Sequence, residues 1–467
     1  PRVRRQRQMC IRDRTMTFGK VPLITEVLDY NSPNIPRDEV SVIRDFIMKE
    51  LTEAAAILPE KYAGGYPNEK GRITKYACLS LKARAALYFG DYALAESTAK
   101  EVMDKGGFSL FKISSLSDAQ KKEAEEMSLY IDFAEKGIDK DEFVKGMFNY
   151  EALWHTENAN PDNPEYIMTR QYAASSWNYQ DMTRYTSMRP NQLGGWSSVT
   201  PTQNLVDAYW GVDGHSVPQL PTPEERAKAY NQIKADLDAY QKPEGEAKFI
   251  AFCQEKIKNG TLKDYKYIQE FRNRDSRMYV SILMPFKSWY ESNYGDKFVY
   301  EWIKNGNNES KTGFNFRKML SLENDANGDG QATGDYPCIR YAEILLIYAE
   351  AHTQTTGYDA ATEAALNQLR DRCGMPDVPS GLSKEEGLKL IQNERRIELA
   401  GEGFRGDDMT RYSDDYWKEH MNNVPIMTPD GDTELTMKWS SRMRLKPIPQ
   451  TAIDLNPLLA GDQNPGY

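Results

Sequence analysis

Apolar residues recur at helical spacing near the start of the chain. Residues 40–58 carry one apolar stripe, residues 75–88 a second, and residues 95–102 a third that is rich in alanine. Gly90 and Asp91 separate the second stripe from the third, which is a typical turn pair. The pattern predicts three helices that each bury one face, and small residues allow the last two to pack closely.

The same unit recurs near the other end of the chain. Residues 341–349 form an apolar stripe, Gly357 provides a turn, an alanine-rich stripe follows at 361–369, and a further helix is expected at about 384–402. Paired helices of this kind, repeated in units of about 34 residues, are typical of tetratricopeptide-like repeats. The fold class predicted from these patterns is therefore mainly α, with tetratricopeptide-like helix pairs.

The middle of the chain, about 107–335, differs from both ends. It is rich in Tyr, Trp, Asn, Gly and Pro, and only the segments near 118–136 and 224–258 have helical spacing. We interpret it as long loops and short strands laid over the helical scaffold. Because loops of this length in a compact protein are usually functional, we expect the binding region here.

Charge and composition narrow the class of function. The net charge of −10 argues against a nucleic-acid binder, since neutralising phosphates requires clustered Lys and Arg. The sequence contains no run of about 18 apolar residues, so it predicts no membrane-spanning helix. The five Cys form no CxxC pair, and the four His stand in no metal-ligand or nucleophile motif, so no enzyme class is indicated.

Residues 1–14 differ in composition from everything after them. They hold six Arg and one Asp, and the chain opens on Pro1 without the apolar segment of an export signal. We expect them to be a foreign or disordered prefix on a chain that has lost its natural start. Cys10 follows Arg7, Gln8 and Met9, so it lacks the small apolar residues that should precede a lipid-attachment cysteine.

A dense block of opposite charges lies near the last predicted helix. It comprises Glu394, Arg395, Arg396, Glu398, Glu402, Arg405, Asp408 and Arg411. A catalytic carboxylate pair needs one acid with a raised pKa, whereas an Arg within one turn of each acid would keep that acid ionised. We therefore expect a structural role, in which the block joins the last helix pair to the C-terminal tail.

Aromatic residues of the middle region are the candidate ligand contacts. Flat aromatic faces stack on the apolar faces of sugar rings, and nearby polar groups such as Asn178, Asp181 and Arg184 can bind hydroxyls. Any single one of these aromatic residues could instead be a packing residue, and Trp177 and Trp196 are favoured by their Ser, Asn and Gly neighbours. The candidates are Trp177, Tyr179, Trp196, Trp154, Trp289 and Tyr290.

One string resembles the first half of a calcium-binding loop. Asp325, Asn327 and Asp329 alternate as oxygen ligands do around calcium, and Gly330 permits the tight turn. The bidentate Glu that should follow is absent, and Asp335 is the nearest substitute. Calcium is the one cofactor that the sequence suggests, and a solvated turn rich in Asp and Asn is the alternative.

Several longer segments resemble segments of the SusD/RagB family, both in amino-acid sequence and in their order along the chain. The most specific are RYAEILLIYAEA at 340–351, AALNQLRDRCGMP at 364–376, NERRIELAGEGFRGDDMTRY at 393–412 and LKPIPQTAIDLNPLLAGDQNPGY at 445–467. Further segments from FGKVPLITEVLD at 18–29 onward also follow the family's order. The resemblance covers nearly everything after Thr17.

The resemblance implies one SusD-like body over residues 15–467. Its helical repeat scaffold would lie at about 38–106 and 338–412, its loop-rich binding region at about 107–335, and its C-terminal tail at 413–467. Family members are nutrient-uptake lipoproteins of Bacteroidetes-like cells, held at the cell surface of the outer membrane by a lipid anchor that this chain lacks.

The family also implies a function, which the residues leave open to alternatives. Family members bind oligosaccharides for polysaccharide utilization, pass them to a SusC-like TonB-dependent transporter, and catalyse nothing. No ligand residue can be carried over by motif. The alternatives are a tetratricopeptide-type protein-binding scaffold and a glycosidase, which would need two carboxylates in one cleft.

Overall fold

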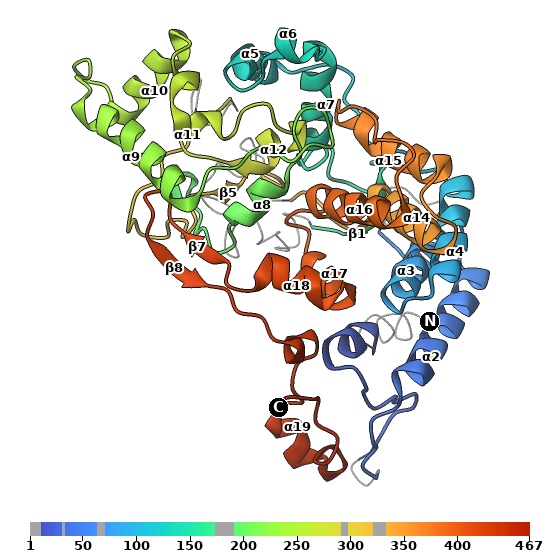
Figure 1. Cartoon of the computed structure of the whole chain (residues 1–467). Helices are drawn as coiled ribbons and strands as arrows, with labels where there is room; N and C mark the ends of the chain where they lie inside the picture. Colours follow the sequence, from blue (N-terminus) through green and yellow to red (C-terminus); the bar gives the residue numbers. More distant parts are fainter. Residues whose placement is uncertain (1–10, 30–32, 63–70, 173–190, 291–297, 321–332) are drawn as a thin grey trace.

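The two predicted groups of scaffold helices form one packed layer. The computed structural model describes residues 11–29, 33–62, 71–172, 191–290, 298–320 and 333–467. Helix α14 packs against α3, α4, α15 and α16, so the early and late parts of the chain share one helical layer (Figure 1). The scaffold helices are α2 (Val40–Ile57), α3 (Lys75–Tyr88), α4 (Tyr92–Lys105), α14 (Tyr341–Thr355), α15 (Ala360–Arg372) and α16 (Lys384–Glu398).

Alanine lies at the contacts between these helices, as the sequence predicted. Ala83 and Ala86 of α3, Ala95 and Ala99 of α4, and Ala349 of α14 are completely buried. Alanine favours the helix, and its small side chain lets two helix axes approach closely. The mainly helical fold class is thereby confirmed.

The predicted turns between paired helices occur where glycine and aspartate stand. Gly90 and Gly357 have φ of +75° and +119°, a region that side chains disfavour. Asp91 then caps α4 by accepting a hydrogen bond from the Leu94 backbone N–H, and Asp359 caps α15 in the same way from Ala361 and Thr362. Each turn thus ends one helix and begins the next.

His352 links the two parts of this layer and gives a pH-dependent prediction. Its ring nitrogens face Glu96 at 2.8 Å and Asp359 at 3.1 Å. Burial disfavours the charged ring, but both carboxylates outweigh burial and raise the pKa of His352 above its ordinary 6.5. The stabilisation is therefore complete below that value and lost as the pH rises through the raised pKa.

We expect His352→Gln to lower the melting temperature most near about pH 5.5 and much less near about pH 8.5. Thermal unfolding of both proteins across this range measures the difference. A difference that stays constant with pH would contradict the assignment of a charged His352.

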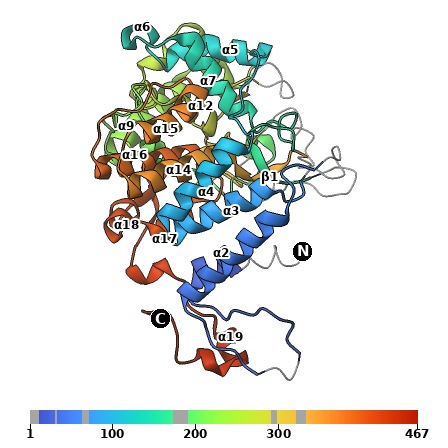
Figure 2. The ribbon, with the colours of Figure 1, turned by 90° about the vertical axis from the view of Figure 1, so that its right-hand side faces the viewer.

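The middle region contains more helix than the sequence indicated. Helical segments occur near 118–136 and 224–258 as predicted, but the 13-residue helix α7 was not predicted. Figure 2 shows α5, α6 and α7 at the top of the molecule, above α14 to α16. The helices of this region are α5 (Asp118–Glu126), α6 (Phe133–Lys136), α7 (Lys140–Ala152), α8 (Gln203–Ala208), α9 (Pro223–Ala239), α10 (Lys248–Lys258), α11 (Lys266–Gln269) and α12 (Ser276–Ser281).

Strands in the described part of the chain form short antiparallel pairs. The longest pair places Tyr166 of β1 opposite Arg340 of β6, which carries Arg340 into the interior directly before α14. The pairs are β1 (Tyr166–Arg170) with β6 (Tyr336–Arg340), β2 (Ile282–Leu283) with β5 (Asn315–Phe316), β3 (Ser288–Trp289) with β4 (Phe298–Val299), and β7 (Pro425–Met427) with β8 (Thr433–Thr436).

The early and the final segments of the described chain meet in a narrow lower lobe (Figure 1). This lobe contains α19 (Gln450–Leu455) and lies below α17 (Arg405–Arg411) and α18 (Asp414–Met421). Arg37 donates to the Asn464 side chain at 2.9 Å, which ties the early segment to the tail. Residues 11–18 are helical, and Arg12 is buried and pairs with Asp407 at 3.1 Å. Residues 1–10 of the predicted prefix lie outside the described residues, and no described helix is long and apolar enough to cross a bilayer.

Candidate functional site

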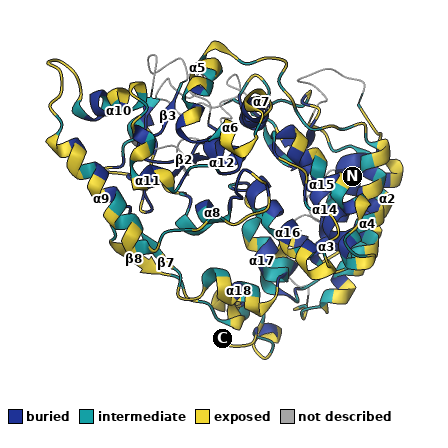
Figure 3. Cartoon of the chain, turned by 45° about the horizontal axis from the view of Figure 1, so that its top comes forward, coloured by how far each residue is buried: buried dark blue, intermediate teal, exposed yellow. Residues whose placement is uncertain are grey.

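A network of buried ion pairs lies where the middle region meets the scaffold. Glu398 of α16 accepts hydrogen bonds from Arg340 at 2.7 Å, from Arg277 at 3.1 Å and from Arg372. Glu402 accepts from Arg340 at 2.6 Å. Figure 3 shows that α12, which carries Arg277, and α14, which follows Arg340, are buried.

These charges hold the acids of the predicted block ionised. Burial alone would raise the pKa of Glu394, Glu398, Glu402 and Asp408, but the nearby Arg and Lys charges outweigh burial and hold each pKa below its usual range. Such carboxylates cannot act as general acids near neutral pH. The predicted structural role fits this arrangement.

The partners of the block differ from those expected. Glu394 pairs with Arg277 and Arg370, so the network joins α16 mainly to the middle region and to α15. The tail takes part through Arg444, which donates to the Thr410 carbonyl at 2.8 Å. Arg405 of the block also donates to the Tyr416 hydroxyl of the tail at 2.8 Å, so the expected link to the tail is one part of a wider network.

Three surface depressions lie along α8 and α9, and we refer to the three together as the trough. The first has a volume of about 380 Å³ and lies between residues 199–205 and the end of α16. The second, about 140 Å³, shares Asn204 with the first, and the third, about 930 Å³, shares Arg226 with the second. The second depression contacts Pro223 and Ala227 of α9 and the third contacts Glu225 and Gln232, so these two depressions lie on different faces of that helix.

The trough combines apolar surface with polar groups. Apolar residues of the first depression include Leu205, Phe316, Leu399, Phe404, Met421 and Met437. The third depression presents the amides of Gln219, Gln232 and Gln269 and the ring of Tyr265. Amide groups both donate to and accept from hydroxyls, so this lining can bind a polyhydroxylated molecule with apolar ring faces.

Two acidic residues line the trough, Asp207 in the second depression and Glu270 in the third. Gln203 donates to Asp207 at 2.7 Å and to Glu270 at 2.8 Å, and Arg226 donates to Glu270 at 2.7 Å. Burial raises the pKa of Glu270 to about 7 against the opposing charge of Arg226. The Glu270 side chain is 2% exposed, although the residue lines the third depression.

Trp196 is the one exposed tryptophan among the described residues, at 47%. The short helix η4 (Asn191–Leu193) precedes it, and buried residues Leu193 and Ser197 hold the segment on either side. Three residues later, Val199 lines the first depression. The structure thus places Trp196 on a fixed segment that leads into the trough.

The other aromatic candidates lie elsewhere. Trp154 and Trp289 are buried among cations, with Lys318 at 5.1 Å from the Trp154 ring and Arg317 at 4.8 Å from the Trp289 ring, so neither offers a face to a ligand. Tyr290 is half-buried, and its hydroxyl bonds to Glu126. Trp177 and Tyr179 lie outside the described residues.

Most of the predicted calcium string also lies outside the described residues. This applies to Asp325, Asn327 and Asp329, so their arrangement is undescribed. Asp335 is buried, and it accepts a hydrogen bond from the Tyr172 backbone N–H at 3.1 Å. Burial raises the pKa of Asp335 to about 6, which makes its charged form less favourable than in water.

Sequence reasoning missed the residues that line the trough. Asn204 and Leu205 lie in the middle region and are not among its aromatic candidates, and Phe404 lies within the charged block. Their signal is weak, because side chains from positions about 200 residues apart meet only after folding. Trp196 was selected for its Ser, Asn and Gly neighbours, and the structure places it on the surface, while its role in a site stays a prediction.

Comparisons with known proteins agree with this fold. A 148-residue stretch is 29% identical to SusD-like protein P2 of Formosa agariphila, and it covers 30% of this chain and 28% of that relative's length. A SusD-like protein of Bacteroides fragilis has a solved structure with a TM-score of 0.69 at 24% identity, which covers 99% of this chain and 78% of that one.

A SusD-like carbohydrate-binding protein of the same species gives a TM-score of 0.64 at 21% identity, over 97% of this chain and 78% of that one. At these identities, the two structures establish the fold alone. The model of the SusD family matches residues 164–467, which is more than half of the chain. The chain therefore belongs to the SusD family.

Proposed function

We propose that this protein binds oligosaccharides at the cell surface, without catalysis, and delivers them to a SusC-like TonB-dependent transporter of the outer membrane. Membership of the SusD family supports this proposal, as does the solved relative described as a carbohydrate-binding protein. A lipid anchor would hold the protein on the outer membrane. The ionised acids of the buried network fit a role without catalysis.

The observation that carries the proposal is the trough with Trp196 at its approach. A sugar chain has apolar ring faces and hydroxyl edges, and the trough offers both kinds of partner along its length. Because buried residues hold the segment of Trp196, stacking a sugar on its ring costs little ordering of the protein.

A glycan array followed by calorimetry tests the proposal. We expect Trp196→Ala to weaken binding of the best oligosaccharide by about tenfold or more, as loss of an aromatic anchor typically costs over about 1 kcal/mol. Tyr467→Ala is the matched control, since Tyr467 is equally exposed at 47% but lies at the chain's end in the lower lobe.

Unchanged binding by Trp196→Ala would remove Trp196 from the site. Absence of binding to every oligosaccharide on the array would contradict the proposed function itself.

A further inference from the structure

Two arginines of the trough have no carboxylate partner among the described residues. Arg396 and Arg405 both line the first depression, yet neither forms an ion pair there. Most buried arginines of this protein do pair with acids, as Arg84 does with Glu343 at 2.5 Å and Arg317 with Glu123 at 2.6 Å. No ion pair among the described residues therefore neutralises Arg396 or Arg405, although Asp408 also lines the depression and the charge of Asp207 acts on Arg396.

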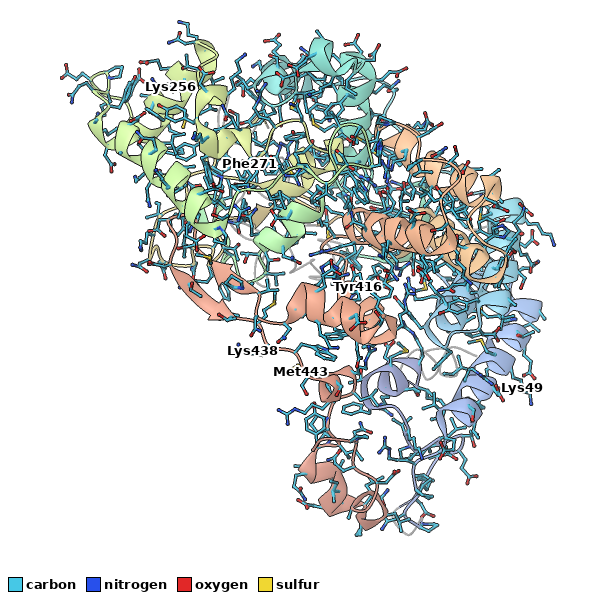
Figure 4. The ribbon with its side chains drawn as sticks, viewed as in Figure 1. Lys49, Lys256, Phe271, Tyr416, Lys438 and Met443 are labelled. Carbon is cyan, nitrogen blue, oxygen red and sulfur yellow. The ribbon has the colours of Figure 1, made fainter. Side chains whose placement is uncertain are left out.

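Neutral groups hold both guanidinium groups in place. Arg396 donates through Nη2 to the Asn204 carbonyl at 2.9 Å and to its side-chain oxygen at 2.6 Å. Arg405 donates through Nη1 to the Tyr416 hydroxyl at 2.8 Å, and its guanidinium carbon lies 5.2 Å from the Tyr416 ring centre (Tyr416 is labelled in Figure 4). The remaining donors of the two groups have no described partner, although a guanidinium carries five N–H groups.

A third arginine of the depression has a buried donor without a described partner. Arg395 lines the same depression and pairs with Asp408 through Nε at 2.8 Å. Its Nη1 is buried but has no hydrogen-bond partner among the described residues, and the whole residue is 1% exposed. A buried donor without an acceptor costs free energy.

The electrostatics of the cluster agree with this reading. Burial, together with the charge of Arg405, lowers the pKa of Arg396 to about 10. Burial also lowers the pKa of His420 to about 4, again with contributions from Arg396 and Arg405. The positive potential that disfavours protonation of His420 would attract an anion.

We infer that the first depression is a subsite for an anionic group on a sugar, a carboxylate or a sulfate, held by Arg396 and Arg405. The inference rests on the proposed function and adds that the preferred oligosaccharides are acidic. Arginine suits this task because its planar fork matches the oxygen pairs of both anions. The apolar side chains of Leu205 and Phe404 would contact the ring that carries the charge.

The test compares acidic and neutral oligosaccharides on the intact protein. The panel contains uronate oligomers, their neutral methyl esters, sulfated oligosaccharides and neutral oligosaccharides of matched length, measured by calorimetry. We expect the tightest ligand to be acidic, with affinity at least tenfold above its neutral counterpart. The comparison of uronates with sulfated sugars identifies which anion the subsite takes.

Two variants locate the effect. We expect Arg396→Gln and Arg405→Gln each to weaken acidic ligands by about tenfold and to leave neutral ones unchanged, a size typical of a charge-assisted hydrogen bond. Arg44→Gln removes the same charge from α2 and should change neither affinity. Raising NaCl from about 50 to about 500 mM should weaken acidic ligands in the native protein more than in Arg396→Gln.

The outcomes distinguish a failure of the anionic subsite from a failure of oligosaccharide binding. If the tightest ligand is neutral, or if both variants, shown folded by circular dichroism, keep their preference for acidic sugars, the anionic subsite is wrong while oligosaccharide binding stands. If no oligosaccharide binds, the proposed function fails together with the subsite.

Discussion

Replacing Glu398 by glutamine is expected to lower the free energy of unfolding by about 3–5 kcal/mol, because it leaves buried positive charge without its partner. Glu398 is completely buried and bonds to Arg277, Arg340 and Arg372. Glutamine preserves the size of the side chain, so the loss reports on charge rather than on packing. Chemical denaturation monitored by circular dichroism measures it.

The control lies on the same helix. Glu385 is exposed in the first turn of α16, so Glu385→Gln should change the free energy of unfolding by less than about 1 kcal/mol. Equal effects of the two substitutions would contradict the view that the buried network joins the middle region to the scaffold.

Gly146→Ala should destabilise the protein by about 3 kcal/mol, although alanine normally favours a helix over glycine. Gly146 lies in α7 against the end of α15, and an added Cβ would be 2.2 Å from the backbone of both Cys373 and Gly374. The backbone cannot yield as a flexible side chain would. The shift in denaturation midpoint measures the loss.

Gly406→Ala, at a second helical glycine, is expected to stabilise the protein. Gly406 lies in α17, and nothing stands within 4 Å of the Cβ that the substitution would add. We expect a gain of about 0.5–1 kcal/mol, since alanine loses less conformational entropy on folding. Stabilisation by both substitutions would show that α7 and α15 do not approach as closely as described.

The helices with one apolar face could be predicted from the sequence, whereas α7 could not. Positions such as Ile43, Ile47 and Leu51 of α2 are buried at helical spacing, and the turns at Gly90 and Gly357 follow from residue chemistry. In α7, most residues from Phe143 to Ala152 are buried, so no polar face marks the period. Gly146 further weakens its helical signal.

The two-residue strands were beyond sequence reasoning for a different reason. An alternating pattern needs about four residues to be recognised, and Ile282–Leu283 and Ser288–Trp289 are shorter. Their pairing depends on tertiary contacts.

The candidate site could be predicted only in part. Trp196 was chosen for its polar neighbours and is exposed three residues before Val199, which lines the first depression, but the same reasoning also selected Trp289, which is buried against Arg317. Sequence alone cannot distinguish these cases, because burial depends on residues far along the chain. For the same reason, the charged block did not reveal that Arg395 and Arg411 pair with acids, while Arg396 and Arg405 form no ion pair within the described part of the chain.

The central claim is that the protein binds oligosaccharides without altering them. The direct measurement incubates pure protein with the tightest ligand of the array and follows the release of new reducing ends by mass spectrometry. We predict that the ligand is recovered intact. Release of shorter sugars that is lost in Glu270→Gln would contradict the claim, because Glu270, with its pKa raised to about 7, and nearby Asp207 would then act as a catalytic pair.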